Sequence, residues 1–222
     1  MIEIEALYKI FYEQSSNPFY ALKDINLTIA KGEAVVISGV SGSGKSTLLS
    51  IIASLDRPSS GRVIVDGEPI SKLPDIHASA YRARSIGFIF QHFNLIESLS
   101  VEENVIAPLI NSQLDMTTIY SMVKRSMEVA NISHKASQSI SELSGGERQR
   151  CAIARALVND PNIIICDEPT ANLDRENSIL FIDILSRLKA EGKSIIIATH
   201  DPLFDSLPFE SRVIEMVDGE IV

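Results

Sequence analysis

The chain has 222 residues, of which 45% are hydrophobic and 22% charged. This is the composition of an ordinary soluble globular protein, so a disordered or collagen-like chain is excluded. Twenty-nine acidic and 20 basic residues give a formal net charge of −9. Proteins that bind DNA or RNA are usually basic, so we expect no nucleic acid among the direct partners.

The sequence shows neither a disulfide framework nor a membrane segment. Its two cysteines, Cys151 and Cys166, lie among apolar neighbours, which fits a reducing compartment. Residues 1–5 alternate isoleucine with glutamate, unlike a signal peptide. The longest apolar runs are strand length, well short of the roughly 18 residues that a membrane helix needs. We therefore expect a soluble, cytoplasmic chain.

Two kinds of strand are predicted along the chain. Residues 2–5 and 25–29 alternate apolar and polar side chains, which is typical of an antiparallel sheet with one wet face. Residues 34–38, 163–166 and 195–198 are almost continuously apolar, as expected of strands covered on both faces. Because helical patterns lie between these apolar strands, they predict a mainly parallel α/β core.

Shorter signals add strands and a helical region. Further strands are expected at residues 62–65 and 86–90, and Asp218-Gly219 suits the type I′ turn of a C-terminal hairpin. Between about residues 100 and 142 the β pattern disappears. There Ser100 and Glu103 have the spacing of a helix capping box, and a second helix is expected from about 115 to 130.

One glycine-rich segment predicts a phosphate site. Residues 39–47 fit the P-loop pattern G-x-x-x-x-G-K-[ST]. Its glycines allow backbone N–H groups to converge on phosphate oxygens, and the next helix presents its positive end to the same anion. Lys45 would add a charge on the β- and γ-phosphates, and Ser46 a hydroxyl on Mg²⁺. The nucleotide-binding residues expected here are Gly39, Val40, Ser41, Gly42, Ser43, Gly44, Lys45, Ser46 and Thr47.

A buried strand that ends in two carboxylates complements the P-loop. Asp167 follows the apolar run 163–166 and is placed to hold Mg²⁺ through water, because this ion dehydrates reluctantly. Glu168 is the candidate general base for the attacking water. An apolar run followed by Asp-Glu is by itself more often a helix start, so the assignment depends on the P-loop.

A second anion site is predicted far along the chain. Ser144 and Glu147 form another capping box, and Gly145 and Gly146 expose N–H groups at the same helix N-terminus. One nucleotide does not need two helix N-termini roughly a hundred residues apart. The second site is therefore expected to serve the nucleotide of another protomer.

Taken in order, these motifs resemble the nucleotide-binding subunit of an ATP-binding-cassette (ABC) transporter over nearly the whole chain. The correspondences are residues 39–47 with the Walker A loop, Gln91 with the Q-loop glutamine, 143–149 with the signature motif, 163–167 with Walker B, 171–174 with the D-loop and His200 with the switch histidine.

The resemblance implies a fold, a reaction and partners. The fold is an α/β P-loop NTPase (RecA-like) parallel core with an N-terminal antiparallel β-subdomain, and an α-helical subdomain inserted at about residues 92–160 of one domain, 1–222. It implies that ATP is hydrolysed with Mg²⁺ by a head-to-tail dimer that drives a separate membrane permease at the cytoplasmic face. The implied catalytic residues are Lys45, Gln91, Glu168 and His200. The implied metal residues are Ser46, Gln91 and Asp167. Gln91, Ser144, Gly145 and Gly146 join the P-loop in binding nucleotide.

The family pattern also suggests an adenine-stacking residue and a branch of the family. The family stacks an aromatic residue, commonly Tyr, on adenine just before the second strand. Counting assigns this role to Phe11, with Tyr12 as the alternative. Residues 91–96, with 103–105 and 108–109, resemble the lipoprotein-releasing, macrolide-exporting and cell-division branch. Phe93, Leu95 and Ile96 either line a groove for the permease or pack the helical insertion onto the core.

Other functions within the family are weighed against transport. DNA-repair members carry a long coiled coil and ribosomal members carry two cassettes, and 222 residues with one copy of each motif fit neither. A signalling module, in which ATP turnover regulates an extracytoplasmic partner without moving a substrate, remains an alternative. The substrate and the direction of transport belong to the permease and are not encoded here.

Overall fold

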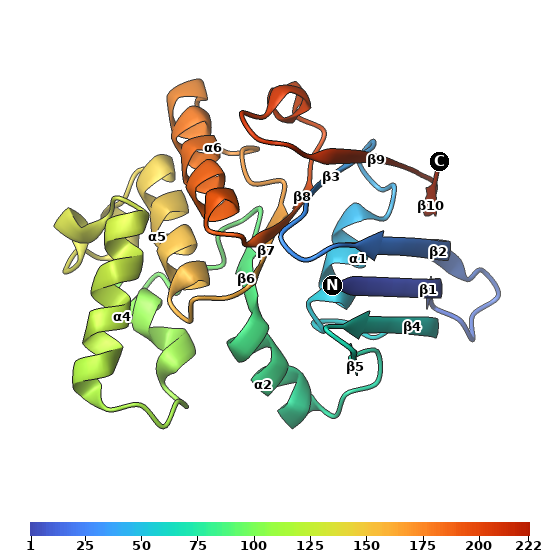
Figure 1. Ribbon diagram of the computed structural model, residues 1–222, viewed down its shortest axis with the longest axis horizontal. Helices are drawn as coiled ribbons and strands as arrows, with labels where there is room; N and C mark the ends of the chain where they lie inside the picture. The colour runs from blue at the N-terminus through green and yellow to red at the C-terminus, as the bar shows by residue number, and fades with distance from the viewer.

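Two β-sheets organise the computed structural model, which describes residues 1–222 (Figure 1). One is an antiparallel sheet in the order β2-β1-β4-β5, and the other a mainly parallel sheet in the order β10-β9-β3-β8-β7-β6. The strands are β1 (Ile2–Phe11), β2 (Phe19–Ile29), β3 (Ala34–Ser38), β4 (Ser60–Val65), β5 (Glu68–Pro69), β6 (Ile86–Ile89), β7 (Ile163–Asp167), β8 (Ser194–Ala198), β9 (Arg212–Val217) and β10 (Glu220–Ile221).

Helices pack on both sides of the parallel sheet. They are α1 (Lys45–Ile52), α2 (Asp75–Ser85), α3 (Val101–Ile106), α4 (Met116–Val129), α5 (Gly145–Leu157) and α6 (Arg175–Ala190), with short 3₁₀ turns at Ala107–Leu109, Ser133–Lys135, Ile140–Glu142 and Pro202–Ser206. Helices α3, α4 and α5 gather at one end of the molecule, away from the antiparallel sheet (Figure 1). None of the helices is both long and apolar enough to cross a bilayer.

The parallel strands are apolar throughout because both of their faces are covered. In β7, Ile163 and Ile165 belong to a core shared with α1 and the antiparallel sheet. Ile164 and Cys166 face the opposite way, into a core shared with α3 to α6. Side chains alternate between the faces of a strand, so each face needs its own apolar set, which confirms the reading of these runs as two-sided strands.

The helical region and the terminal hairpin also agree with the sequence. Ser100 and Glu103 form the predicted capping box at the start of α3. Helix α4 begins after an Asp115 cap and ends at Val129, within a residue or so of the predicted bounds. Asp218 and Gly219 both have positive φ angles between β9 and β10, as a type I′ turn requires.

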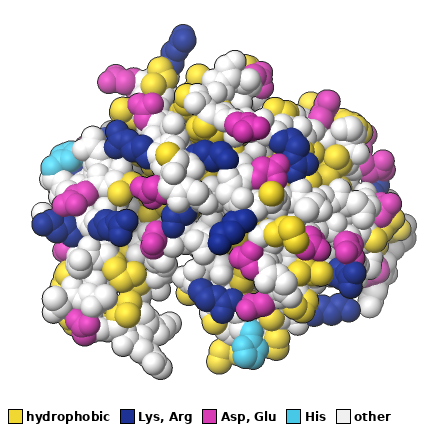
Figure 2. All heavy atoms as spheres, viewed as in Figure 1, with side chains coloured by type: hydrophobic (Ala, Val, Ile, Leu, Met, Phe, Trp, Pro, Cys, Tyr) yellow, Lys and Arg dark blue, Asp and Glu magenta, His cyan; other side chains and the backbone are white.

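Charges of both signs cover the surface that Figure 2 shows. Lys and Arg side chains are interspersed with Asp and Glu over this face, in a chain whose formal net charge is −9. Interspersed charges cancel within a short distance. This face therefore offers no extended positive field to a polyanion.

A buried amide fixes the segment that joins β6 to α3. The side chain of Asn104, which is fully buried, accepts a hydrogen bond from Ile96 N at 2.8 Å and donates to Ile96 O at 3.0 Å and Ser100 O at 2.9 Å. The bond to Ile96 N satisfies a backbone donor that no strand or helix pairs, and the other two add a second donor to carbonyls that already accept from Leu99 N and Asn104 N. Asn104 thereby holds the loop that follows Gln91.

Asn104→Ala should lower the free energy of unfolding by about 2–3 kcal/mol, because it leaves the backbone N–H of Ile96 without a partner and removes a buried amide that makes two further hydrogen bonds. Urea denaturation measures the change. Asn111→Ala, at an exposed turn position, is the matched control and should change stability by less than about 0.5 kcal/mol. Equal effects of the two substitutions would contradict this role of Asn104.

Candidate functional site

A cavity of about 260 Å³ opens at the carboxyl edge of the parallel sheet. It is lined by Phe19, Ala21, Ser41, Gly42, Gly44, Lys45, Ser46, Thr47, Gln91, Glu168 and His200. The P-loop follows β3, Gln91 follows β6, Glu168 follows β7 and His200 follows β8. Parallel strands end at the same edge, and ligands of α/β proteins bind there. The topology thus brings four distant segments to one site.

Glycine is required where the P-loop meets the rest of the protein. Gly39 has a φ of 145° and Gly44 a φ of 102°, and residues that carry a side chain rarely adopt such backbone angles. A Cβ on Gly39 would lie 2.3 Å from Met216 O, and one on Gly44 would lie 2.5 Å from Ala21 O. The loop is therefore pressed against β9 and β2, which fixes its backbone N–H groups.

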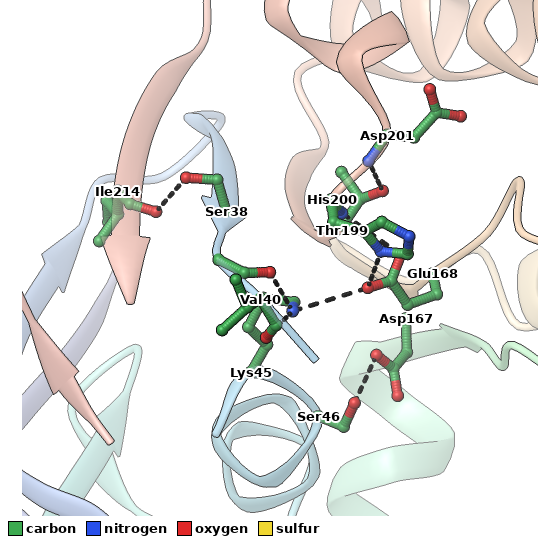
Figure 3. Close-up of polar contacts among 11 residues, drawn as sticks. Ser38, Val40, Lys45, Ser46, Asp167, Glu168, Thr199, His200, Asp201 and Ile214 are labelled. Carbon is green, nitrogen blue, oxygen red and sulfur yellow. Dashed lines mark hydrogen bonds and ion pairs between the residues drawn. The ribbon is translucent and has the colours of Figure 1, made fainter. Parts of the chain in front are cut away.

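Lys45 places a buried ammonium at the centre of this loop. The residue is 5% exposed, and its Nζ donates to Gly39 O at 2.6 Å and Val40 O at 3.0 Å (Figure 3). The carboxylate of Glu168 lies 3.6 Å away. A buried cation is stable only when it is paired. Carbonyl dipoles and one carboxylate supply that pairing, at a position where phosphate oxygens would also be favoured.

Ser46 and Asp167 form the second polar contact of the site. Ser46 Oγ donates to Asp167 Oδ1 at 2.8 Å (Figure 3). Burial raises the pKa of the Asp167 carboxyl above its usual value, and the hydrogen bond from Ser46 opposes this shift. A hydroxyl and a carboxylate, with the side-chain amide of Gln91 lining the same cavity, are the hard oxygen donors that Mg²⁺ prefers. The residues present fit this ion.

Glu168 lies between the ammonium and an imidazole. Its Oε1 is 2.9 Å from His200 Nδ1, and the backbone N–H of His200 donates to Oε2 at 3.4 Å. The side chain of Glu168 is 11% exposed and that of His200 66% exposed. The φ of Glu168 is 44°, an uncommon angle for a residue with a side chain. The turn aims this carboxylate along the cavity wall.

The predicted signature residues do not join this cavity. Ser144, Gly145 and Gly146 begin α5, and Ser144 forms the predicted capping box with Glu147. Gly145 lines a different hollow, of about 350 Å³, with Phe93 and Asn172. The P-loop and the start of α5 therefore line two separate hollows of the chain.

The aromatic residues near the cavity partly differ from the expectation. Phe11 ends β1 rather than immediately preceding β2, and Phe19 is its cross-strand partner. The two rings stack with centroids 6.5 Å apart, and Phe19 lines the cavity whereas Phe11 does not. Tyr12 is 77% exposed. Sequence reasoning missed Phe19, although pairing β1 with β2 as a hairpin would have placed it beside Phe11.

The remaining predicted P-loop residues, Gly39, Val40 and Ser43, do not line the cavity. Gly39 and Val40 present their carbonyls to Lys45 rather than lining the cavity. Ser43 is 1% exposed, and its Oγ has no hydrogen-bond partner. The cavity is thus lined by one face of the loop, Ser41, Gly42 and Lys45 among them.

Comparison with known proteins places this site in a family. The model of the family described as "ABC transporter" matches residues 22–171, a range that includes the P-loop, the signature segment and the Asp167–Glu168 pair. The chain belongs to the ABC transporter family. It is an ATP-hydrolysing cassette that uses ATP and Mg²⁺.

Relatives match along the full chain. The uncharacterized ABC transporter ATP-binding protein YknY of Bacillus subtilis is 41% identical over all of this chain and 95% of its own length. The macrolide export ATP-binding/permease protein MacB of Campylobacter jejuni is 42% identical over 90% of this chain, which covers 31% of that longer protein. The chain therefore corresponds to one part of the MacB-type proteins.

Solved structures confirm the fold class. A dimeric structure of the bacterial ABC transporter cassette MJ0796 superimposes with a TM-score of 0.91 at 38% identity, over all of this chain and 96% of that one. A second MJ0796 dimer, in a post-hydrolysis state bound to ADP and phosphate, matches equally well. The expected combination of a parallel core, an antiparallel sheet and added helices is thus the fold of ABC cassettes.

The capping box of the signature helix gives a prediction about pH. Hydrogen bonds from the backbone N–H and hydroxyl of Ser144, with Lys135 3.1 Å away, lower the pKa of Glu147 from 4.5 to about 2. A lowered pKa stabilises the fold above pH 4.5, and this stabilisation is lost as the pH falls towards 2. Glu147→Gln should therefore cost about 1 kcal/mol of unfolding free energy at neutral pH.

The difference in unfolding free energy between Glu147→Gln and the wild type should become smaller below about pH 4.5. Urea denaturation of both proteins at several pH values measures it. Glu128→Gln removes a carboxylate that is 58% exposed and 4.0 Å from Lys124, and it should change stability little at any pH. A difference for Glu147→Gln that stays constant down to pH 3 would contradict the lowered pKa.

Proposed function

We propose that the chain acts as one half of a dimer that closes on two ATP molecules and drives a membrane permease. The observation that carries this proposal is the separation of the two anion-binding helix starts. The cavity collects the P-loop, Gln91, Glu168 and His200, whereas Ser144 and its glycines lie outside it. A second copy would supply the missing signature residues to each cavity, and the dimeric MJ0796 structures support this arrangement.

In this proposal the P-loop holds the phosphates. The backbone N–H groups of residues 41–47 and the Lys45 ammonium bind the β- and γ-phosphate oxygens. The carbonyls that now accept from Lys45 hold its Nζ in place for them. Ser46, Asp167 and Gln91 would hold Mg²⁺, which when bound neutralises charge on the phosphates.

Glu168 is the proposed general base. Its carboxylate accepts a proton from the attacking water, and its contacts to His200 and Lys45 orient it. His200 is exposed at the mouth of the cavity and would contact the γ-phosphate. The Ser144 hydroxyl and the N–H groups of Gly145 and Gly146 would reach the same phosphate from the partner copy.

The aromatic pair is the proposed site of the adenine. Phe11 offers a ring face, as expected from the sequence, and Phe19 stacks on it from the adjacent strand and reaches the cavity. Tyr12 follows the end of β1 and is the most exposed of the three. We therefore assign base stacking to the Phe11–Phe19 pair.

The permease partner and the location are part of the same proposal. MacB is named as an ATP-binding/permease protein, and this chain, in which no helix could span a bilayer, matches only part of it. We propose that a separate membrane subunit supplies the transport path, and that the chain binds it at the cytoplasmic face. The helices between β6 and β7 form the proposed inserted subdomain, about residues 92–160.

Glu168→Gln should retain ATP binding but lower the rate of hydrolysis by about 100-fold or more, because it removes the base and leaves the P-loop intact. The variant should accumulate as a dimer with ATP, measured by size-exclusion chromatography with light scattering. Glu210→Gln, at an exposed position, is the control. A Glu168→Gln protein that stays monomeric at millimolar ATP would contradict the sandwich.

The loop after Gln91 is the proposed permease contact. Ile96 is 48% exposed, whereas Leu95 packs against the core that includes α3 to α6. Phe93 is half-buried, and the guanidinium of Arg155 donates to its carbonyl at 2.5 Å. Of the three apolar side chains considered from the sequence, Ile96 is therefore free to meet a partner and Leu95 serves packing.

Ile96→Asp should leave the melting temperature and basal ATPase activity unchanged and lower co-purification with the cognate membrane subunit by about tenfold. Leu95→Asp should lower the melting temperature, because it buries a charge. Ile76→Asp is the matched control, since Ile76 is 76% exposed on α2 and should not affect co-purification. Wild-type co-purification of the Ile96 variant would remove this residue from the interface.

A further inference from the structure

The start of α6 packs unusually closely on the signature helix α5. A Cβ built on Gly146 would lie 2.4 Å from Asn177 Oδ1, and one on Gly145 would lie 3.5 Å from Asn172 O. Both signature glycines therefore face the segment 172–177, which contains the D-loop-like residues. Any side chain at position 146 would displace Asn177.

The side-chain amide of Asn177 joins a guanidinium and a carboxylate. Its Oδ1 accepts a hydrogen bond from Arg150 Nη1 at 2.8 Å. Its Nδ2 donates to both carboxylate oxygens of Asp174, at 2.9 and 3.0 Å. Its backbone N–H also donates to Asp174 Oδ1 at 2.8 Å, which caps α6. The result is a chain of bonds from α5 through Asn177 to the end of the D-loop.

The chemistry of this position suits asparagine in particular. The amide presents an acceptor to a guanidinium and a donor to a carboxylate at the same time. Arg150 is half-buried, its Nε has no partner, and the bond to Asn177 is its one polar contact. Loss of that acceptor would leave the guanidinium without a hydrogen-bond partner, which is costly for a charged group.

We infer that Asn177 is a positioning residue that fixes the signature helix to the D-loop, so that both present one rigid surface to the nucleotide of the partner copy. This inference rests on the proposed ATP-sandwich dimer. The pairing Arg150–Asn177–Asp174 does not touch the P-loop cavity of its own chain. Nucleotide binding to a single chain should therefore be independent of Asn177, and dimer closure should depend on it.

Two variants separate the roles. Asn177→Leu removes both the acceptor for Arg150 and the donor to Asp174. The double variant Asp174→Asn with Asn177→Asp exchanges the amide and the carboxylate: Arg150 keeps an acceptor at position 177, the two side chains can still hydrogen-bond, and asparagine is a good N-cap for α6. Each is made in the Glu168→Gln background, and the ATP concentration for half-maximal dimer formation is measured by light scattering.

Asn177→Leu should raise that ATP concentration about tenfold, the effect of losing one hydrogen bond to a charged group. The double variant Asp174→Asn with Asn177→Asp should stay within about threefold of the parent. ADP binding, measured by calorimetry on the monomer, should be unchanged in both. A residue with a merely structural role would instead lower ADP binding and dimerisation together.

Thr118→Ala is the matched control. Thr118 occupies the same third position of α4 that Asn177 occupies in α6, and its Oγ1 donates to the capping residue Asp115 at 2.7 Å. This substitution removes an equivalent capping contact on a helix that lies outside the signature and D-loop contacts. It should lower the melting temperature by an amount similar to that for Asn177→Leu and leave dimerisation at the parent level.

The outcomes distinguish this inference from the proposed function. If Glu168→Gln alone does not dimerise, the sandwich is wrong and the role of Asn177 falls with it. If the parent dimerises and Asn177→Leu does so at the same ATP concentration, the positioning role alone is overturned. It is also overturned if the double variant Asp174→Asn with Asn177→Asp is as defective as Asn177→Leu, or if Thr118→Ala impairs dimerisation equally.

Discussion

The buried ammonium of Lys45 imposes the constraint on which the site depends. A cation that is 5% exposed must have oxygen partners within a few ångströms. Gly39 O, Val40 O and Glu168 Oε1 provide them from two different strand ends. These partners follow β3 and β7, which lie two positions apart in the sheet with β8 between them. The order of the strands thus allows the Lys45 ammonium to be paired with Glu168.

The parallel sheet then brings the remaining chemistry to the same edge. Because β6, β7 and β8 run in the same direction as β3, the residues after each strand emerge beside the P-loop. Glycines at 39 and 44 let this loop press on β9 and β2. The antiparallel sheet thereby becomes a wall of the cavity and contributes Phe19 and Ala21. The antiparallel and the parallel sheet thus both contribute residues to one cavity.

Much of this arrangement is local enough to predict from sequence. Two-sided strands and capping boxes are defined by neighbouring residues, and the structure confirms them. The P-loop pattern is equally local. Phe19 was missed because its place depends on the pairing of β1 with β2, which includes bulges and a positive φ at Ala6. Asn177 gave no signal either, since its contacts with Arg150 and Gly146 arise only when α6 packs on α5.

The separation of the signature helix from the P-loop gives each chain two incomplete halves. In the proposed dimer, the half that contains Lys45 and Glu168 would bind a nucleotide from one side, and the half that begins at Ser144 would contact the nucleotide of the partner copy. Closure of a dimer therefore requires α5 to be held in a defined orientation relative to the core. Gln149 Nε2 donates to Pro169 O, directly after Glu168, at 2.9 Å. With the Arg150–Asn177 bond, this contact holds α5 both to the loop that follows β7 and to the first turn of α6. In the proposed dimer, a displacement of α5 by the nucleotide of the partner copy would therefore move Pro169, the residue next to the proposed general base Glu168 of the same chain.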